Sequence, residues 1–369
     1  MTDLRIYQIG LTMINGIGDV LARHLLDTVG DAETVFRERP AALQKIPGIT
    51  GSLAGEIKRP EVLLRAEQEL TFIEKNRIRV YFFSEPDYPA RLKECPDAPL
   101  LFYFKGNADL NAPRILSIVG TRKATDYGKG LTESFLKELA AYFPDTLIVS
   151  GLAYGIDICA HRHALKCHLP TVAVLAHGLD RIYPPLHRPT AVEMVQQGGL
   201  LTDFPQGTIP NKSNFIKRNR IVAGLSDATL VIESAEKGGS LITADIAFSY
   251  GRDVFAFPGR VYDPHSKGCH LLIRQNKAAL ITSADDLIRA LCWDVNAPDI
   301  RLPQQTQILF PEHPQHEQLT RLLRENGEMH INQLACELNL PVHQVSSLLF
   351  ELEMEGGVRV FPGDRYRLI

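Results

Sequence analysis

From residue 115 to residue 256, short apolar runs alternate with glycine-containing turns and longer amphipathic segments. This alternation restricts the possible folds more than any other feature of the sequence. Ile115–Val119, Thr171–Leu175 and Ala228–Ile232 are short and almost continuously apolar, as strands buried on both faces are. Buried strands that alternate with helices predict an α/β fold, a Rossmann-like, doubly wound and mostly parallel sheet. In such sheets, ligands bind beyond the carboxyl ends of the strands, where these glycine turns must lie.

The chain of 369 residues is long enough for several domains, and four segments are expected. Glycine turns at 14–18 and 46–49 break short helices in residues 1–75, which predicts a helix-hairpin-helix or SAM-like domain; a small helical packing module is the alternative. The other segments are a Rossmann-like domain at 76–293, a linker at 294–312 and a winged-helix domain at 313–369. Within the central domain, further strands are expected at 78–83, 100–104, 147–149, 199–202 and 254–256, and helices at 128–142, 156–168, 215–225, 240–250 and 270–275.

The charge is distributed unevenly along a chain whose formal net charge is −3. Residues 211–220 carry four basic side chains and no acid, and a Gly238-Gly239-Ser240 turn that opens a helix follows shortly after. Basic side chains beside a glycine turn at a helix start favour phosphate groups, because free N–H groups and the helix dipole attract anions. Residues 1–75 have nine basic and eleven acidic residues, and residues 313–369 have five and eight. We therefore expect the central domain to hold a polyanion.

Four turns are expected to meet at one edge of the sheet: 120–122, 150–155, 215–220 and 237–240. None of them has the G-x-G-x-x-G or G-x-x-x-x-G-K-[ST] pattern, so neither a dinucleotide site nor a P-loop is indicated. In order and spacing, these turns are similar to those of one family. The segments that carry the similarity are IVGTR (118–122), SGLAYGID (150–157), GLDRIYPP (178–185), DFPQG (203–207), FIKRNRIVAGLS (215–226), GGSLITA (238–244), FPG (257–259) and GCHLLI (268–273).

On these segments the chain resembles the bacterial DNA-processing protein A family, DprA or Smf, from about residue 80 to residue 285. The resemblance implies a protein that binds single-stranded DNA without catalysis, forms a homodimer through its Rossmann-like domain and loads RecA onto incoming strands during natural transformation. No cofactor is implied. The residues expected to contact the DNA are Gly120, Thr121, Arg122, Gly151, Lys212, Phe215, Lys217, Arg218, Asn219, Arg220, Gly239 and Ser240.

Physical chemistry suggests a role for most of these residues. Arg122 can form two parallel hydrogen bonds to one phosphate, whereas Lys212, Lys217 and Arg218 supply point charges along the strand. Arg220 either joins them or braces the sheet edge, and Asn219 braces its loop. Phe215 either stacks on a base or packs under its helix. The N–H groups of Gly239 and Ser240, with the Ser240 hydroxyl, can bind another phosphate.

Two alternative functions remain open. The first is an enzyme of the phosphoribohydrolase type that acts on a small nucleotide; such enzymes place a catalytic glutamate shortly after a PGGxGT turn, but residues 238–245 contain none. Asp157 and His161 are expected to form a structural hydrogen bond rather than an acid–base pair. In the second alternative, the winged helix is the main DNA reader. Its third helix, at 342–355, carries Glu351, Glu353 and Glu355 without Lys or Arg, which favours contact with a protein.

Metal binding and membrane insertion are not expected. The six cysteines are scattered, which suits free thiols in a reducing compartment. Cys159, His163 and Cys167 follow one helical stripe, with His161 and His168 close by, but a single helix rarely supplies a complete set of metal ligands. No apolar run reaches membrane-spanning length, and residues 1–10 lack the basic-then-apolar pattern of a leader, so we expect a cytoplasmic protein.

Overall fold

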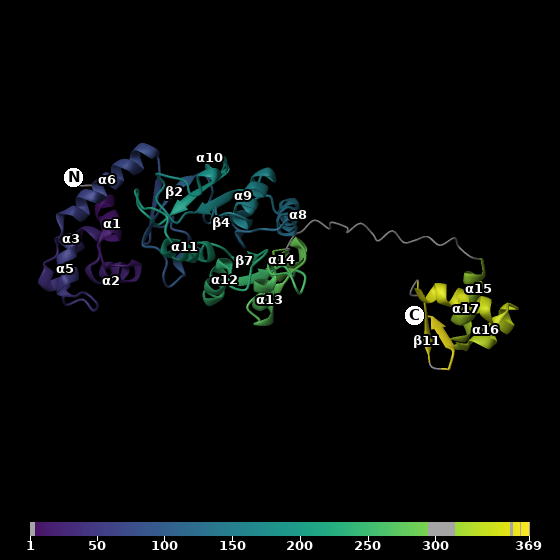
Figure 1. Cartoon of the computed structure of the whole chain (residues 1–369). Helices are drawn as coiled ribbons and strands as arrows, with labels where there is room; N and C mark the ends of the chain where they lie inside the picture. The colour runs from purple at the N-terminus through teal and green to yellow at the C-terminus, as the bar shows by residue number, and fades with distance from the viewer. Residues whose placement is uncertain (1–3, 294–313, 355–356, 362, 369) are drawn as a thin grey trace. The chain divides into compact units, whose positions relative to one another are not determined.

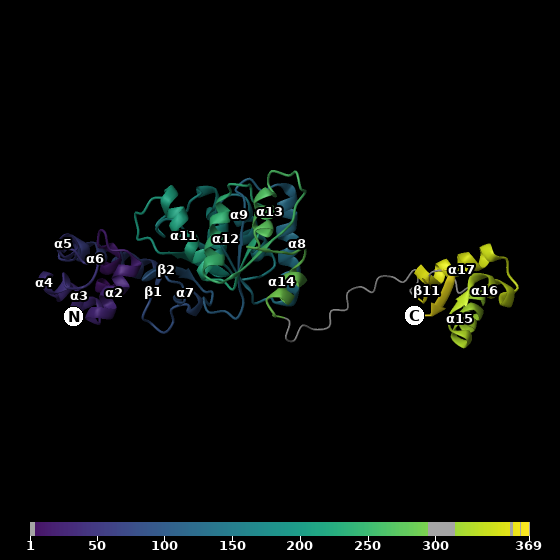
Figure 2. The ribbon, with the colours of Figure 1, turned by 90° about the horizontal axis from the view of Figure 1, so that it is seen from below.

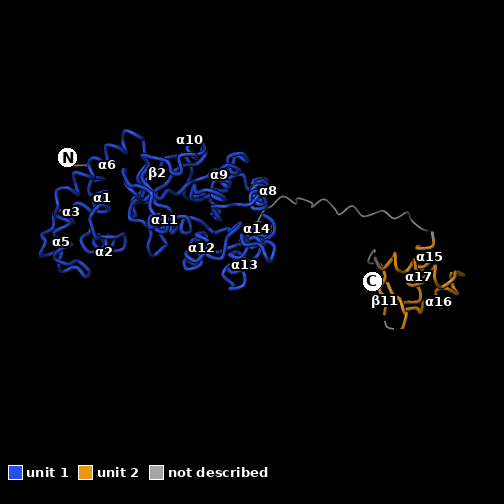
Figure 3. Tube along the Cα trace, in the orientation of Figure 1, with its two compact units in different colours: residues 1–296 blue, residues 297–369 orange. Residues whose placement is uncertain are grey.

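The computed structural model of the chain describes residues 4–293, 314–354, 357–361 and 363–368. The chain divides into two compact units, residues 1–296 and residues 297–369 (Figure 3). The linker predicted at 294–312 lies outside the described residues, as do Glu355 and Pro362 of the predicted winged helix. No helix in the described part of the chain combines the length and the apolar character that crossing a bilayer requires.

A nine-stranded sheet forms the centre of the larger unit, in the order β1-β2-β6-β5-β4-β3-β7-β8-β9. The last seven strands in this order, β6 through β3 to β9, are parallel to one another. Strands β1 and β2 add an antiparallel edge, in which β2 pairs with β6. The predicted mostly parallel, doubly wound sheet is confirmed. The strands are β1 Arg79–Phe82, β2 Leu101–Gly106, β3 Ile115–Val119, β4 Leu147–Ser150, β5 Thr171–Val174, β6 Gly198–Thr202, β7 Ala228–Val231, β8 Asp253–Ala256 and β9 Ala279–Leu280.

Helices cover both faces of this sheet (Figures 1 and 2). One face is covered by α8 Asp126–Tyr142, α9 Ile156–Lys166, α10 Arg188–Gln196 and α14 Ala284–Ala290, and the other by α11 Lys212–Gly224, α12 Gly239–Ser249 and α13 Lys267–Arg274. The short helices α7 Ala90–Lys93 and η1 Pro185–His187 lie in connections. Strands β4, β5 and β6 are added in turn on one side of β3, and β7, β8 and β9 are added in turn on its other side. The strand order thus reverses between β3 and β7. The carboxyl ends of β3 and β7 therefore border the crevice in which doubly wound sheets bind ligands.

Six helices precede the sheet: α1 Leu4–Met13, α2 Asp19–Val29, α3 Ala32–Arg37, α4 Pro40–Leu43, α5 Gly51–Ile57 and α6 Pro60–Asn76. The predicted glycine turns are present, and Gly16 and Gly48 have φ of +83° and +89°, a conformation that glycine adopts without steric cost. The apolar core of these helices also contains Leu100, Leu101 and Tyr103, from β2 and the residue before it. The helical segment is thus anchored on the antiparallel edge of the sheet.

The smaller unit has the predicted winged-helix fold. Its elements are α15 Pro314–Asn326, β10 Met329–His330, α16 Ile331–Leu338, α17 Val342–Met354, β11 Val358–Phe361 and β12 Arg365–Leu368. The strands form a sheet in the order β10-β12-β11. Its core is built on Leu319, Leu334, Leu349 and Val358, all of them at most 1% exposed.

Candidate nucleic-acid interface

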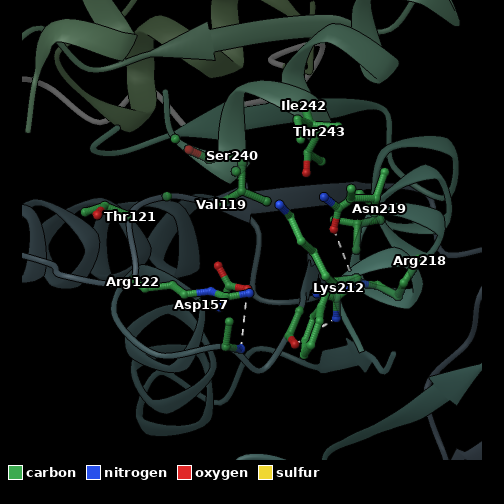
Figure 4. Close-up of a pocket in the computed structure, with 18 of the residues that line it drawn as sticks. Val119, Thr121, Arg122, Asp157, Lys212, Arg218, Asn219, Ser240, Ile242 and Thr243 are labelled. Atoms are coloured by element: carbon green, nitrogen blue, oxygen red, sulfur yellow. Dashed lines mark hydrogen bonds between the residues drawn. The ribbon is translucent and has the colours of Figure 1, made fainter. Parts of the chain in front are cut away.

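A pocket of about 770 Å³ lies at the carboxyl ends of β3 and β7, where the four predicted turns meet. Figure 4 shows Arg122 and Asp157 on one side of it and Lys212 and Asn219 on the other. Lys217 and Arg220 are not part of the lining. The other ten predicted residues line the pocket: Gly120, Thr121, Arg122, Gly151, Lys212, Phe215, Arg218, Asn219, Gly239 and Ser240.

The turn after β3 is fixed by backbone contacts, and the side chain of Arg122 extends from it into the pocket (Figure 4). Thr121 N donates to the carbonyl oxygen of Glu233, 2.7 Å away, and its own carbonyl accepts from Ile156 N at 3.2 Å. A Cβ on Gly120 would lie 2.5 Å from Cγ1 of Ile156, so the turn can approach α9 this closely only with glycine. Arg122 is exposed, and its guanidinium carbon lies 5.1 Å from the centre of the Phe215 ring.

The start of α12 forms the second wall of the pocket. Gly238 is the N-cap and has no side chain to cap the helix, so the first N–H groups of the helix lack an intrahelical partner. A Cβ on Gly239 would meet no atom within 4 Å, which leaves this helix end open to a ligand. The Ser240 hydroxyl donates to Ser234 Oγ at 2.8 Å, so its predicted phosphate contact would require that bond to break. Exposed Lys237 also lines the pocket; it belongs to the predicted turn but was not among the predicted contacts.

Helix α11 contributes the third wall. Asn211 caps it by accepting from Asn214 N at 2.9 Å, and Lys212 is exposed at its first turn. Phe215 is half-buried, with its ring centre 6.1 Å from that of Tyr183. Tyr183 lines the pocket as well, although it was not predicted. The sequence signal for it was the GLDRIYPP segment, whose position after β5 places it at the same edge of the sheet.

Arg218 is a buried part of the pocket wall rather than a freely exposed charge. It is 4% exposed, and its Nη1 donates to the carbonyl oxygen of Gly151 at 2.8 Å and to that of Val174. Burial lowers the pKa of Arg218 to about 10, so it stays charged at neutral pH. Burial also raises the pKa of the nearby Asp157 carboxyl, and the positive charge of Arg218 opposes that shift. The positive charge of Arg218 and the negative charge of Asp157 therefore offset each other in the buried wall of the pocket.

Lys217 and Arg220 lie on another face of α11, outside the pocket that the other ten predicted residues line. Arg220 is 6% exposed, and its Nη2 lies 2.7 Å from Asp203 Oδ2 and 3.1 Å from Asp19 Oδ2. Lys217 Nζ lies 3.6 Å and 3.8 Å from the same two oxygen atoms. At 100° per residue, positions 217 and 220 turn away from positions 212, 215 and 219. Of the two expected roles for Arg220, the structure favours bracing the sheet edge.

The predicted hydrogen bond between Asp157 and His161 is replaced by other partners. Asp157 Oδ2 accepts a long bond from Ala153 N at 3.4 Å, whereas His161 Nδ1 lies 2.7 Å from Thr171 Oγ1. Burial lowers the pKa of His161 to about 3, so the imidazole is neutral at physiological pH. Among the described residues, no group of three or more His, Cys, Asp or Glu side chains is arranged to hold a metal ion.

Three sequence profiles match the chain. The profile of DNA recombination-mediator protein A matches residues 79–292, that of the DprA winged helix domain matches residues 303–364, and that of the SAM-like helix-hairpin-helix tandem matches residues 9–59. Among curated relatives, Protein Smf of Synechocystis sp. is 31% identical over 392 residues, which cover 98% of both chains.

Solved structures similar to this chain include two of DNA processing protein A. The X-ray structure of DNA processing protein A from Streptococcus pneumoniae has a TM-score of 0.64 and 32% identity, and the match covers 78% of this chain and 98% of that one. A structure of DNA processing protein A from Helicobacter pylori, described for its single-stranded DNA binding mode, has a TM-score of 0.53 and 30% identity. That match covers 59% of this chain and 97% of the other.

Proposed function

The chain belongs to the DNA recombination-mediator protein A family, also called DprA or Smf, and from this premise we propose that its pocket binds the backbone of single-stranded DNA. The observation that carries the proposal is the convergence of three exposed cations, Arg122, Lys212 and Lys237, on one open helix start. Cations and free N–H groups are what phosphate oxygens require. Because these groups reach phosphates rather than base edges, we expect little sequence preference.

The proposal extends to what happens to the bound strand. We propose that this protein protects incoming DNA and loads RecA onto it during natural transformation. It acts as a homodimer through the Rossmann-like domain, so two linked pockets raise the affinity for a long strand. In its presence, RecA should begin hydrolysing ATP sooner on DNA covered by a single-strand-binding protein. Arg122→Ala should remove this effect. If the wild-type protein left the delay before ATP hydrolysis by RecA unchanged, the loading role would be contradicted.

We propose that the pocket carries out no reaction. Its lining includes one carboxylate, Asp157, and that group is buried near the positive charge of Arg218 and accepts a hydrogen bond from Ala153 N. Asp245, the acid nearest to the position of a phosphoribohydrolase glutamate, lies 2.7 Å from Lys277 Nζ and does not line the pocket. Incubation with nucleoside monophosphates should release no free base; release of a base that Arg122→Ala abolishes would establish the enzyme instead.

The strand-binding proposal can be tested with two lysines of the same helix. Lys212 lines the pocket and Lys217 does not, so Lys212→Ala and Lys217→Ala are matched in charge and secondary structure. With a short oligothymidylate, Arg122→Ala should bind at least tenfold more weakly, a loss of about 1.4 kcal/mol. Lys212→Ala should weaken binding several-fold, and Lys217→Ala should stay close to wild type. Equal losses for the two lysine variants would place the strand elsewhere.

A further inference from the structure

The outer face of the winged-helix sheet carries a cluster of arginines that the pocket does not account for. In the β11–β12 ladder, Arg359 stands opposite Arg367, and Phe361 stands opposite Arg365. Side chains alternate along a strand, so these four residues share one face of the sheet. The other face carries Val358, which is 1% exposed and belongs to the core of the unit. The arginine face is therefore the outer one.

All three arginines on this face are exposed. Arg365 has an ion pair of 3.3 Å with exposed Glu328, whereas neither Arg359 nor Arg367 forms an ion pair with any other residue in the described part of the chain. Like charges directly opposite each other weaken a β-ladder. The placement of Arg359 opposite Arg367 thus weakens the hairpin when nothing is bound, and it favours the binding of an anion.

Phe361 indicates what kind of anion fits this face. It is half-buried and is not among the side chains that pack on the core of this unit. An aromatic ring beside several arginines on a sheet surface suits an unpaired nucleic-acid strand, because the ring can stack on a base while the cations meet phosphates. A duplex keeps its bases stacked within the helix and offers none for the ring.

The third helix of the unit argues against the usual duplex contact. A winged helix normally inserts this helix into the major groove, but α17 carries Glu351 and exposed Glu353 without any Lys or Arg. We propose that the outer face of the β11–β12 hairpin, formed by Arg359, Phe361, Arg365 and Arg367, is a second site for single-stranded DNA. It goes beyond the proposed function, because it lies on a different unit from the pocket. It also replaces the expectation of a protein contact, which considered α17 alone.

The test uses the full-length chain with Arg359→Gln and Arg367→Gln combined. With an oligothymidylate of about forty nucleotides, the variant should bind at least fivefold more weakly. The slope of log K against log salt should become shallower by about 1.4, since two phosphate contacts are lost. The matched control combines Arg321→Gln and Arg324→Gln on α15, which removes the same charge from exposed positions of the same unit. The control should bind like wild type.

A six-nucleotide strand and a duplex separate the possible outcomes. The short strand, bound in the pocket, should be held equally by wild type and by the arginine variant, whereas Arg122→Ala should weaken it. Arg359→Lys with Arg367→Lys keeps the charge and should restore most of the long-strand affinity, which excludes misfolding as the cause. Unchanged affinity and salt slope for the long strand would overturn the second site. A loss confined to duplex DNA would overturn its assignment to single strands.

Discussion

Arg218 and Gly151 must be considered as a pair, because the arginine occupies the space that a side chain at position 151 would need. A Cβ on Gly151 would lie 2.5 Å from Nη2 of Arg218 and 2.7 Å from Oδ2 of Asp157. The guanidinium also satisfies two backbone carbonyl groups at the ends of β4 and β5. A cation in the proposed phosphate pocket can therefore be chiefly a structural residue, while exposed neighbours such as Arg122 remain available to the ligand.

This arrangement predicts that Arg218→Met destabilises the protein by about 3 kcal/mol. The substitution leaves Asp157 buried without its compensating charge and removes the donor from two buried carbonyl groups. Adding Asp157→Asn should recover part of the loss, because the buried group is then neutral. Urea unfolding of the single and double variants measures both effects. Equal stability of wild type and Arg218→Met would show that the buried charge pair contributes nothing to the fold.

At the scale of elements, most of the strands and helices of the central domain were predictable because they are short, strongly apolar or clearly amphipathic. The bounds predicted for β3 agree with the structure, and those for α11 differ by three residues at its start and one at its end. Helices α10 and α14, of nine and seven residues, were not predicted, whereas α13, of eight residues, was. The position of β1 and β2 at the edge of the sheet depends on pairing between distant residues, which local patterns do not encode.

The pocket was predictable from the position of four turns at the same ends of parallel strands. The phase of α11 was not. Its cations occupy two faces of the helix, and charge periodicity alone does not show which face meets the ligand. The distinction comes from Asp19 and Asp203, which lie far from Arg220 in the sequence and pair with it in the structure. Similarly, no local signal showed that Arg218 would be buried against the ends of two strands.

The ion pairs on the far side of α11 anchor the first helical segment, which leads to a prediction for Asp19. Asp19 Oδ2 pairs with Arg220, and its Oδ1 accepts from Leu100 N at 3.0 Å. Asp19→Asn keeps the acceptor but loses the charge, so we expect a loss of stability of about 1 kcal/mol or more. Thermal unfolding measures this loss. Asp27→Asn, at an exposed position of the same helix, should have no effect on the unfolding temperature. Affinity for a short oligonucleotide should not change in either variant, because the ion pairs lie outside the pocket. A large drop in the affinity of the Asp19→Asn variant would show that these ion pairs orient the pocket.

A second contact between elements should make stability depend on pH. The Glu69 carboxylate on α6 is 3% exposed and accepts from Gln206 N at 3.0 and 3.1 Å. Burial raises its pKa to about 7, from an ordinary value of 4.5, although the bond from Gln206 and the charge of Arg65 oppose the shift. Because the folded state binds the proton more tightly than the unfolded state, stability is lost as the pH rises from about 4.5 to about 7, by an amount on the order of 3 kcal/mol.

Glu69→Gln should remove this dependence, since the amide keeps an acceptor for Gln206 N and never ionises. The variant should be close to wild type in stability at pH 5 and more stable than wild type at pH 8. Glu67→Gln, at an exposed position of the same helix, should follow the wild-type pH curve. The measurement is the midpoint of urea unfolding as a function of pH. A constant difference between Glu69→Gln and wild type across this range would contradict the raised pKa.

At the scale of the whole molecule, a chain with formal net charge −3 is proposed to bind a polyanion, which is possible only where positive charge is concentrated locally. Overall repulsion keeps nonspecific contact weak, so strand affinity must come from a few close phosphate contacts. In the pocket, these are the three exposed cations and the start of α12. About four phosphates can therefore be neutralised there, each releasing counterions when it binds.

For a six-nucleotide strand, this count predicts a slope of log K against log salt of about −3. Arg122→Ala should reduce the magnitude of the slope by about 0.7, since one phosphate contact is lost, whereas Lys217→Ala should leave it unchanged. Anisotropy titrations at several salt concentrations provide the slopes. The slope distinguishes backbone contacts from base stacking more directly than affinity does, because stacking on Phe215 or Tyr183 releases no counterions. A slope near zero together with tight binding would therefore show that the aromatic rings, rather than the cations, bind the strand.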